Sequence, residues 1–140
     1  MEANRVIEAA RECVGVPFRH QGRNLNGLDC IGLVRWPAFK LGMIDPGDDF
    51  LNYGREPQPH IMARELDKRL ERAPLDDLRP TDILWFRIIQ DPQHLALYTG
   101  KTIIHAVNGG PFRVVEHGFR HPWPKRLYRA YRYPDVEWQV

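Results

Sequence analysis

The hydrophobic spacing of the chain changes near Pro80. Before this residue, apolar side chains recur at the three- and four-residue intervals typical of amphipathic helices. After it, the apolar residues fall into short runs bounded by Gly, Pro and Asn, as in strands. Helices followed by strands predict an α+β fold, in which N-terminal helices pack on an antiparallel β-sheet.

The same patterns give approximate bounds for these elements. The expected helices cover residues 4–14, 30–41 and 60–72. The expected strands cover residues 83–88, 94–99, 102–106, 112–116 and 127–133, with turns at Asp91-Pro92, Gly100-Lys101 and Asn108-Gly109-Gly110. Residues 18–28 and 45–60 are rich in Gly, Asn, Asp and Pro and are expected to be loops. The second loop either lines a substrate or partner site or only connects two helices.

The size and charge of the chain limit the classes of protein to which it can belong. At 140 residues it is long enough for one compact domain, so we expect residues 1–140 to form a single domain. Its 20 basic residues are scattered among 18 acidic ones, and the formal net charge is only +2. Because nucleic-acid-binding domains usually carry a basic patch or stripe, we expect no nucleic-acid partner.

The sequence also lacks the apolar segments that membranes and secretion require. No apolar run approaches the roughly 18–20 residues that span a bilayer, so we expect no membrane span. The first residues, Met1–Arg5, lead into an amphipathic segment without the apolar stretch of a signal peptide. The sequence therefore predicts synthesis in the cytoplasm without a signal peptide.

The two cysteines, Cys13 and Cys30, are too few for a disulfide framework, and a reducing cytoplasm argues against their pairing. Cys13 lies on the apolar stripe of the first helix, where a buried and inert thiol is expected. Cys30 follows Asp29, a good N-cap residue, at the start of the second helix. A helix start stabilises a thiolate through its free N–H groups and dipole. Position alone leaves a nucleophile and a cysteine without a role equally open.

Two histidines on neighbouring strands supply the base that a thiol nucleophile needs. His94 opens its strand, and an imidazole there can take and return the proton of Cys30. A hairpin turn at Gly100-Lys101 would place His105 beside Ala96, close to His94. A third polar group that orients the base completes a Cys-His-His arrangement.

The other histidines are expected to be less central. His20 precedes the cysteine in its loop and can line the same site. His60, His117 and His121 show no comparable placement and are expected at the surface.

Metal chemistry is the main alternative for the same side chains. Cys30, His94 and His105 are of the kinds that bind zinc. The chain has no C-x-x-C or H-E-x-x-H spacing, so we expect no metal and no other cofactor. Its carboxylates are dispersed, which disfavours the paired acids of glycosidases.

Five short motifs resemble those of the NlpC/P60 cysteine peptidases. Leu28–Val34 (LDCIGLV) resembles the family's nucleophile motif, Gln93–Tyr98 (QHLALY) its histidine strand, and Ile104–Ala106 (IHA) its second histidine motif. Gly15–Arg19 (GVPFR) and Arg79–Asp82 (RPTD) are similar to two further family segments. The motifs follow the family's order over most of the chain, and together they are far more specific than any one alone.

The resemblance implies a papain-like NlpC/P60 fold and hydrolysis of peptide bonds in the stem peptides of bacterial peptidoglycan, typically beside a D-γ-glutamyl residue. By position, Cys30 is then the nucleophile, His94 the general base and His105 the residue that orients the base. Asp29 and His20 would contribute to substrate binding.

One substrate-site residue departs from the family pattern. The family commonly has Tyr where this chain has Phe18, which lies twelve residues before the cysteine. The contribution of that hydroxyl is either missing here or supplied by another donor such as His20. Thr81 replaces the glycine of a family turn and concerns only the turn.

The loop Arg19–Arg23 resembles the subset of this family encoded by tailed phages, prophages and gene transfer agents. A wall hydrolase without a signal peptide would then reach the periplasm and cell wall in a phage-like tail, with tail-tip or baseplate proteins as partners. Release by lysis would serve the same end.

Two other functions stay open for the same fold. The first is a weakly active or inactive structural or binding module of the tail tip, which the loss of a tyrosine at Phe18 favours. The second is a thiol amidase or acyltransferase that acts on another acyl substrate.

Overall fold

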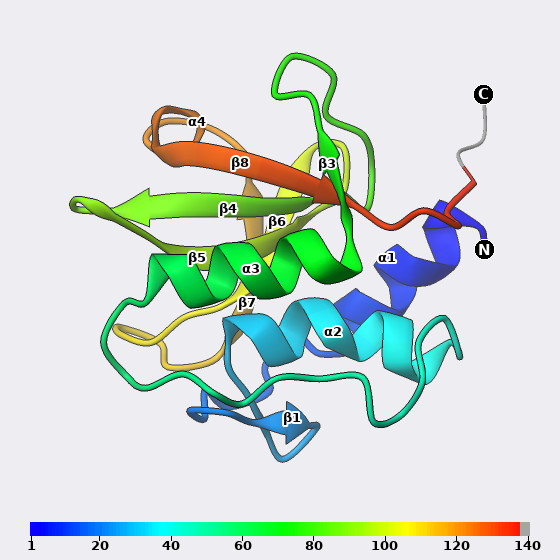
Figure 1. Cartoon of the computed structure of the whole chain (residues 1–140), viewed down its shortest axis with the longest axis horizontal. Helices are drawn as coiled ribbons and strands as arrows, with labels where there is room; N and C mark the ends of the chain where they lie inside the picture. Colours follow the sequence, from blue (N-terminus) through cyan, green and yellow to red (C-terminus); the bar gives the residue numbers. More distant parts are fainter. Residues whose placement is uncertain (138–140) are drawn as a thin grey trace.

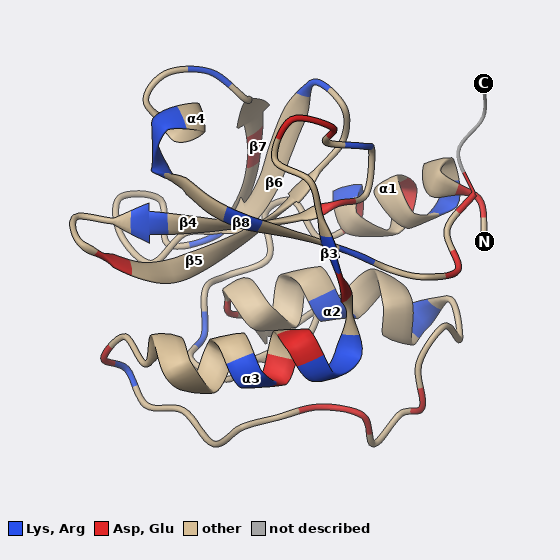
Figure 2. Cartoon of the chain, turned by 45° about the horizontal axis from the view of Figure 1, so that its top comes forward, with Lys and Arg blue, Asp and Glu red and all other residues tan. Residues whose placement is uncertain are grey.

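The computed structural model describes residues 1–137, and its architecture is the expected α+β arrangement. Three N-terminal helices are formed by α1 (Ala3–Arg11), α2 (Cys30–Lys40) and α3 (Pro59–Arg69). Figures 1 and 2 show α2 and α3 side by side against one face of a sheet, with the short helix α4 (Trp123–Arg126) on the other face. None of the described helices is long and apolar enough to cross a membrane.

The sheet has six antiparallel strands in the order β3-β8-β4-β5-β6-β7. Their bounds are β3 (Glu71–Ala73), β4 (Ile83–Ile88), β5 (Asp91–Tyr98), β6 (Thr102–Ala106), β7 (Val114–Gly118) and β8 (Leu127–Arg132). The β5–β6 hairpin has the predicted register, with Leu97 opposite Ile104 and Tyr98 opposite Ile103. These central strands place both candidate histidines in the middle of the fold.

Two strand bounds differ from the prediction. The turn expected at Asp91-Pro92 is wrong, because β5 already begins at Asp91. Pro92 lies where the β4–β5 register shifts, a position at which a strand tolerates a residue without an N–H group. β7 begins two residues later than expected, because Phe112 has a φ of 50° and cannot lie in a strand. This shift brings His117 into β7.

Several short elements were not predicted. β1 (Arg23–Asn24) and β2 (Gly27–Leu28) form a small hairpin inside the loop before α2, and α4 is a single helical turn. α3 ends at Arg69, and the residues expected to continue it form β3, which pairs with β8. Each of these elements is stabilised by tertiary contacts that local spacing does not encode.

Each face of the sheet carries its own hydrophobic cluster. The larger one lies between the helices and the sheet, and its fully buried members include Val6, Leu33, Trp85, Leu95, Leu97 and Tyr131. The smaller one lies on the other face around Leu84, Phe86, Ala96 and Ile103, with Trp123 packed against it. Cys13 has no exposed surface and belongs to the larger cluster, as the sequence predicted.

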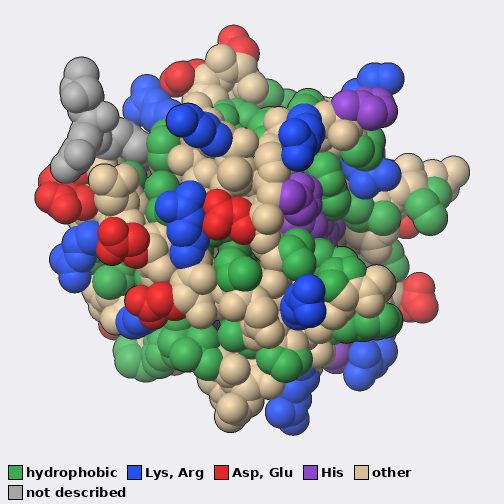
Figure 3. Space-filling model, turned by 180° about the vertical axis from the view of Figure 1, so that it is seen from behind, with side chains coloured by type: hydrophobic (Ala, Val, Ile, Leu, Met, Phe, Trp, Pro, Cys, Tyr) green, Lys and Arg blue, Asp and Glu red, His purple; other side chains and the backbone are tan. Residues whose placement is uncertain are grey.

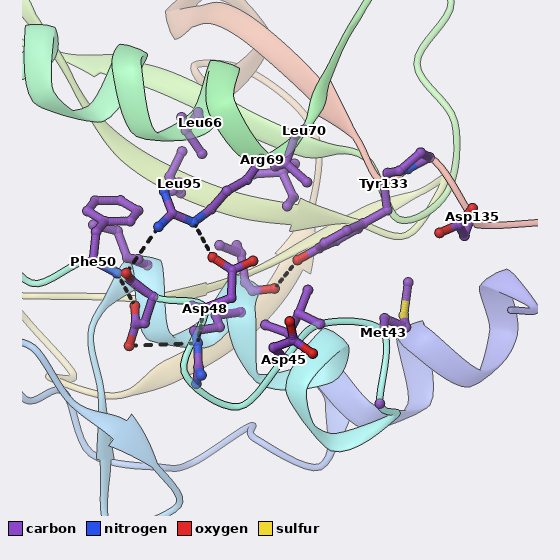
Figure 4. A pocket seen from close by; sticks show the side chains of 18 residues that line it. Met43, Asp45, Asp48, Phe50, Leu66, Arg69, Leu70, Leu95, Tyr133 and Asp135 are labelled. Atoms are coloured by element: carbon purple, nitrogen blue, oxygen red, sulfur yellow. Dashed lines mark hydrogen bonds and ion pairs between the residues drawn. The ribbon is translucent and has the colours of Figure 1, made fainter.

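Arginine side chains fix the long segment 45–58 to the helices that it runs beside (Figure 2). Arg69 of α3 donates to the Asp48 carboxylate at 2.8 Å and to the Asp49 carbonyl oxygen at 3.0 Å. Figure 4 shows this contact from close by. Arg35 of α2 donates to the carbonyl oxygens of Asp48, at 3.1 Å, and Pro46, at 2.8 Å. The segment is therefore held in place although it contains no helix or strand before α3.

α2 approaches the preceding loop so closely that Gly32 is required. A Cβ atom on Gly32 would overlap the carbonyl oxygen of Gly22. A backbone atom cannot move aside as a flexible side chain can, so the loop or the helix would have to shift.

We therefore expect Gly32→Ala to lower the free energy of unfolding by about 3 kcal/mol, the scale of a severe overpacking change. Urea unfolding measures it. Gly47→Ala is the matched control, because a Cβ there meets no atom within 4 Å and should change stability by no more than about 0.5 kcal/mol. Equal stability of the two variants would contradict the close approach.

Candidate active site

The start of α2 is organised by Asp29, as predicted. Asp29 is the N-cap residue, and its Oδ1 atom accepts a hydrogen bond from the Gly32 amide at 2.8 Å. Cys30 is the first residue of the helix. The cap thus fixes where α2 begins, and with it the position of Cys30.

The Asp29 carboxylate receives three further donors and is only 4% exposed. Arg23 Nη1 donates to Oδ1 at 2.9 Å, and the Gln21 amide donates to Oδ2 at 2.9 Å. The Tyr53 hydroxyl also donates to Oδ2. With two donors on each oxygen, Asp29 joins the loop before α2, the helix itself and segment 45–58.

Cys30 lies where β5 is no longer paired with β6. The two strands pair at Leu97–Ile104 and Tyr98–Ile103. The backbone N–H groups of Leu95 and Ile31 act on the Cys30 thiol and lower its pKa. α2 packs on the face of the sheet that carries Leu95. The end of the pairing therefore lets Cys30 reach the strand that carries His94.

Burial and the neighbouring Asp29 carboxylate raise the pKa of the Cys30 thiol to about 12. The two backbone donors act in the opposite direction but with less effect. The expectation that the helix start alone would stabilise a thiolate is therefore wrong, because desolvation outweighs it. The resting sulfur is a neutral thiol that needs a base.

The predicted histidine pair is brought together. His94 Nε2 lies 2.7 Å from His105 Nδ1, and His105 is 2% exposed. Burial lowers the pKa of His94 to about 4. Burial, together with the neighbouring His94 and His117 rings, lowers the pKa of His105 to about 3. Both imidazoles are therefore neutral bases near pH 7.

A third histidine, which the sequence placed at the surface, belongs to the same cluster. His117 Nε2 lies 2.8 Å from His105 Nε2. The predicted strand ended at Glu116, so the alternation along β7 that puts His117 on the face of His105 was missed. The indole ring of Trp123 packs against all three imidazoles, with ring centroids 5.0–5.9 Å apart.

These groups line one cavity of about 620 Å³. Its walls contain all six residues singled out from the sequence, namely Phe18, His20, Asp29, Cys30, His94 and His105. Residues 53–58 form another wall, so the long segment 45–58 is part of the site and more than a connection. Histidine side chains emerge among hydrophobic ones on the back of the molecule in Figure 3.

A tyrosine hydroxyl is present in the cavity although Phe18 carries none. Tyr53 donates to Asp29 and accepts a hydrogen bond from Arg23 Nη2 at 2.7 Å. Burial and the Asp29 carboxylate raise its pKa, so the hydroxyl stays protonated. His20, the donor suggested from the sequence, packs edge-on against the Tyr53 ring at 5.6 Å. The sequence analysis left open whether the segment that contains Tyr53 lines a site, because this segment has no periodicity from which its position could be predicted.

The histidine nitrogens do not converge on a common point. They bond one another in sequence from His94 to His105 to His117. Within residues 1–137, no group of three His, Cys, Asp or Glu side chains is arranged to hold a metal ion. The zinc alternative thus has no donor set in the described part of the chain.

A second cavity, of about 420 Å³, contains none of the predicted site residues. Figure 4 shows its apolar side chains, among them Leu66, Leu70 and Leu95, beside the Arg69–Asp48 ion pair. Its lining contains no cysteine, serine, threonine or histidine.

The two cysteines should differ in their rate of reaction with a thiol reagent, because only one of them lines a cavity. Cys30 is half-buried and lines the cavity that also contains His94, whereas Cys13 has no exposed surface and does not line it. We expect iodoacetamide at pH 8 to alkylate Cys30 at least roughly tenfold faster than Cys13, as read by peptide mass mapping. His94→Ala should remove most of this difference. Equal labelling of the two thiols would exclude a reactive Cys30.

Buried neutral histidines should also make stability depend on pH. Their folded pKa values, about 4 for His94 and about 3 for His105, lie below the ordinary 6.5, so below pH 6.5 the unfolded chain binds more protons. The free energy of unfolding should fall by roughly 1–2 kcal/mol per histidine from pH 7 to pH 5. Urea unfolding at both values tests this, and the double variant His94→Gln/His105→Gln should show a smaller fall. An unchanged pH dependence in that variant would contradict the assignment.

Known proteins resemble this chain in sequence and in fold. A model of the NlpC/P60 family matches residues 15–132. A probable endopeptidase of Mycobacterium tuberculosis is 31% identical over 131 residues, which are 91% of this chain and 29% of that protein. The chain therefore spans less than a third of the length of the curated relatives that it matches.

Two solved structures illustrate the range of this fold. The NlpC/p60 domain of the peptidoglycan hydrolase SagA superposes with a TM-score of 0.68 at 16% identity, over 94% of this chain and 99% of that one. RipD of Mycobacterium tuberculosis, described as a non-catalytic NlpC/p60 domain protein adapted to peptidoglycan binding, superposes with a TM-score of 0.59 at 19% identity, over 93% and 95%. With the shared fold and the family match over residues 15–132, the chain belongs to the NlpC/P60 family.

Proposed function

We propose that residues 1–140 act as one catalytic domain, a cysteine peptidase that hydrolyses peptide bonds of bacterial peptidoglycan beside a D-γ-glutamyl residue. The observation that carries this proposal is the bond between His94 Nε2 and His105 Nδ1 in the cavity that also contains Cys30. A nucleophile, a base and a group that orients the base are the parts that thiol-dependent acyl transfer requires.

In the proposed reaction, the neutral thiol and imidazole act together. As the sulfur of Cys30 attacks the substrate carbonyl carbon, His94 takes the thiol proton. His94 then gives this proton to the leaving amine, and a thioester on Cys30 remains. Water, deprotonated by the same imidazole, hydrolyses the thioester and restores the thiol. His105 holds the His94 ring in place throughout.

The substrate-binding roles of Phe18, His20 and Asp29 are part of the proposal. Phe18 and His20 face the cavity and offer apolar and edge contacts to a peptide. Asp29 has all its oxygens occupied by protein donors. Its proposed contribution is therefore indirect, through the hold on Tyr53, which lines the cavity.

Relatives support this reading and also supply its main alternative. The curated relative is named a probable endopeptidase, and the SagA domain comes from a peptidoglycan hydrolase. RipD, by contrast, is described as non-catalytic. A weakly active or inactive tail-tip module is accordingly the second candidate, and Phe18 in place of tyrosine is the observation that favours it. A thiol amidase or acyltransferase is a third.

We further propose that the protein is carried by a phage-like particle and acts in the periplasm and cell wall, with tail-tip or baseplate proteins as partners. The proposal depends on the loop Arg19–Arg23, which resembles the phage-borne subset of the family. In the structure this loop is anchored to the site itself, since Arg23 bonds Asp29 and Tyr53.

Purified protein incubated with defined muropeptides should release new fragments, identified by mass spectrometry, and Cys30→Ala should reduce their rate of release at least about 10³-fold. Cys13→Ser is the matched control for loss of a thiol outside the site. If neither the unmodified protein nor Cys30→Ala releases fragments between pH 5 and 9, sedimentation with purified sacculi tests the binding-module alternative.

A further inference from the structure

We propose that His117 is a positioning residue. It fixes which nitrogen donates in each hydrogen bond along the three imidazoles, so that His94 presents an unprotonated Nδ1 to Cys30. This inference rests on the proposed function of the same cavity. It concerns a residue that neither the family motifs nor the sequence patterns single out. It follows from five nitrogens, one carbonyl oxygen and the rule that a neutral imidazole has one N–H group.

The chain of bonds is anchored at a backbone carbonyl. His117 Nδ1 lies 3.1 Å from the carbonyl oxygen of Gly118. A carbonyl oxygen only accepts hydrogen bonds, so the proton must be on Nδ1. In the neutral ring, Nε2 of His117 then carries a lone pair and can only accept.

The protonation of His117 determines the donor and the acceptor in each of the next two hydrogen bonds. His105 Nε2, 2.8 Å away, must donate to His117, which leaves a lone pair on His105 Nδ1. His94 Nε2, 2.7 Å from that nitrogen, must donate to it. The remaining nitrogen, His94 Nδ1, is then an acceptor. Among the described residues it has no other hydrogen-bond partner, and His94 shares the cavity with Cys30.

The surroundings hold the three rings in this geometry. His105 is almost completely buried, and the Trp123 indole packs against each imidazole. β7 places His117 opposite Ile103 and Val115 opposite His105, so His105 and His117 lie on one face of adjacent strands. The packing therefore holds the three rings at the distances that their hydrogen bonds require.

If donor and acceptor were exchanged in each of these hydrogen bonds, His94 could not act as a base. With all rings neutral, the exchanged arrangement requires a proton on His117 Nε2. A lone pair of His117 Nδ1 then faces the Gly118 carbonyl oxygen, and the hydrogen bond between these two atoms is lost. The exchanged arrangement also puts the proton of His94 on Nδ1, which then cannot accept the proton of Cys30. One neutral hydrogen bond corresponds to a roughly twofold to tenfold preference between the two arrangements.

Replacing His117 separates this role from simple packing. His117→Leu removes the acceptor, whereas His117→Gln can retain an amide oxygen to accept from His105. We expect His117→Leu to lower kcat for muropeptide cleavage roughly twofold to tenfold with KM little changed, and His117→Gln to recover most of the loss. Thermal unfolding of both variants checks that the fold is kept.

The decisive measurement is independent of cleavage. Long-range ¹H–¹⁵N spectra of ¹⁵N-histidine-labelled protein at pH 7 report which ring nitrogen carries the proton. In the unmodified protein we expect protons on Nδ1 of His117 and on Nε2 of His105 and His94. In His117→Leu, a fraction of His94 should carry its proton on Nδ1.

The outcomes distinguish this inference from the proposed function. A proton on His94 Nδ1 in the unmodified protein, or an unchanged His94 in His117→Leu, would overturn the inference even if muropeptides are cleaved. The expected spectra without any cleavage would support the role of His117 and refute the peptidase. If His117→Leu does not fold, the spectra of the unmodified protein and of His117→Gln still decide between the two arrangements.

Discussion

The Asp29 carboxylate connects three parts of the chain that together form the site. It caps α2, and it also binds the Arg23 side chain and the Tyr53 hydroxyl. Because Cys30 is the next residue, the group that starts the helix also fixes the sulfur relative to the wall at Tyr53. Removing such a carboxylate would leave buried donors without partners, at a cost of about 1–3 kcal/mol for each. The site and the stability of its surroundings therefore depend on one side chain.

A second constraint is the early end of the β5–β6 pairing. Beyond Leu97 and Ile104 the two strands are not paired, and the Leu95 backbone group in this part of β5 lowers the pKa of Cys30. The resulting burial keeps the thiol and imidazole uncharged at rest, with pKa values of about 12 and 4. In such an environment charge appears only when the two groups react, so the orientation of the base matters more than its resting ionisation.

The sequence predicted the parts of the site that local patterns define. The place of Cys30 at a helix start follows from the N-cap and helix spacing, and the register that puts His105 near His94 follows from the short turn at Gly100-Lys101. His117 was missed because the positive φ at Phe112 delays β7, a conformation that a propensity pattern does not reveal. The role of the segment that contains Tyr53 stayed open for a different reason. Its place depends on contacts between segments far apart in the chain, which have no local signature.

Segment 45–58 has two parts, one that binds arginine side chains of the helices and the preceding loop and one that lines the cavity. Residues 46–53 make the contacts with Arg23, Arg35 and Arg69, whereas residues 54–57 line the cavity. Gln58 begins the next helix and accepts hydrogen bonds from the Gly54, Ile61 and Met62 amides. The lining can therefore change in sequence while the helices, the sheet and the reacting groups stay as they are. Substitutions in residues 54–57 would therefore reshape one wall of the cavity with little effect on the packing of the helices against the sheet.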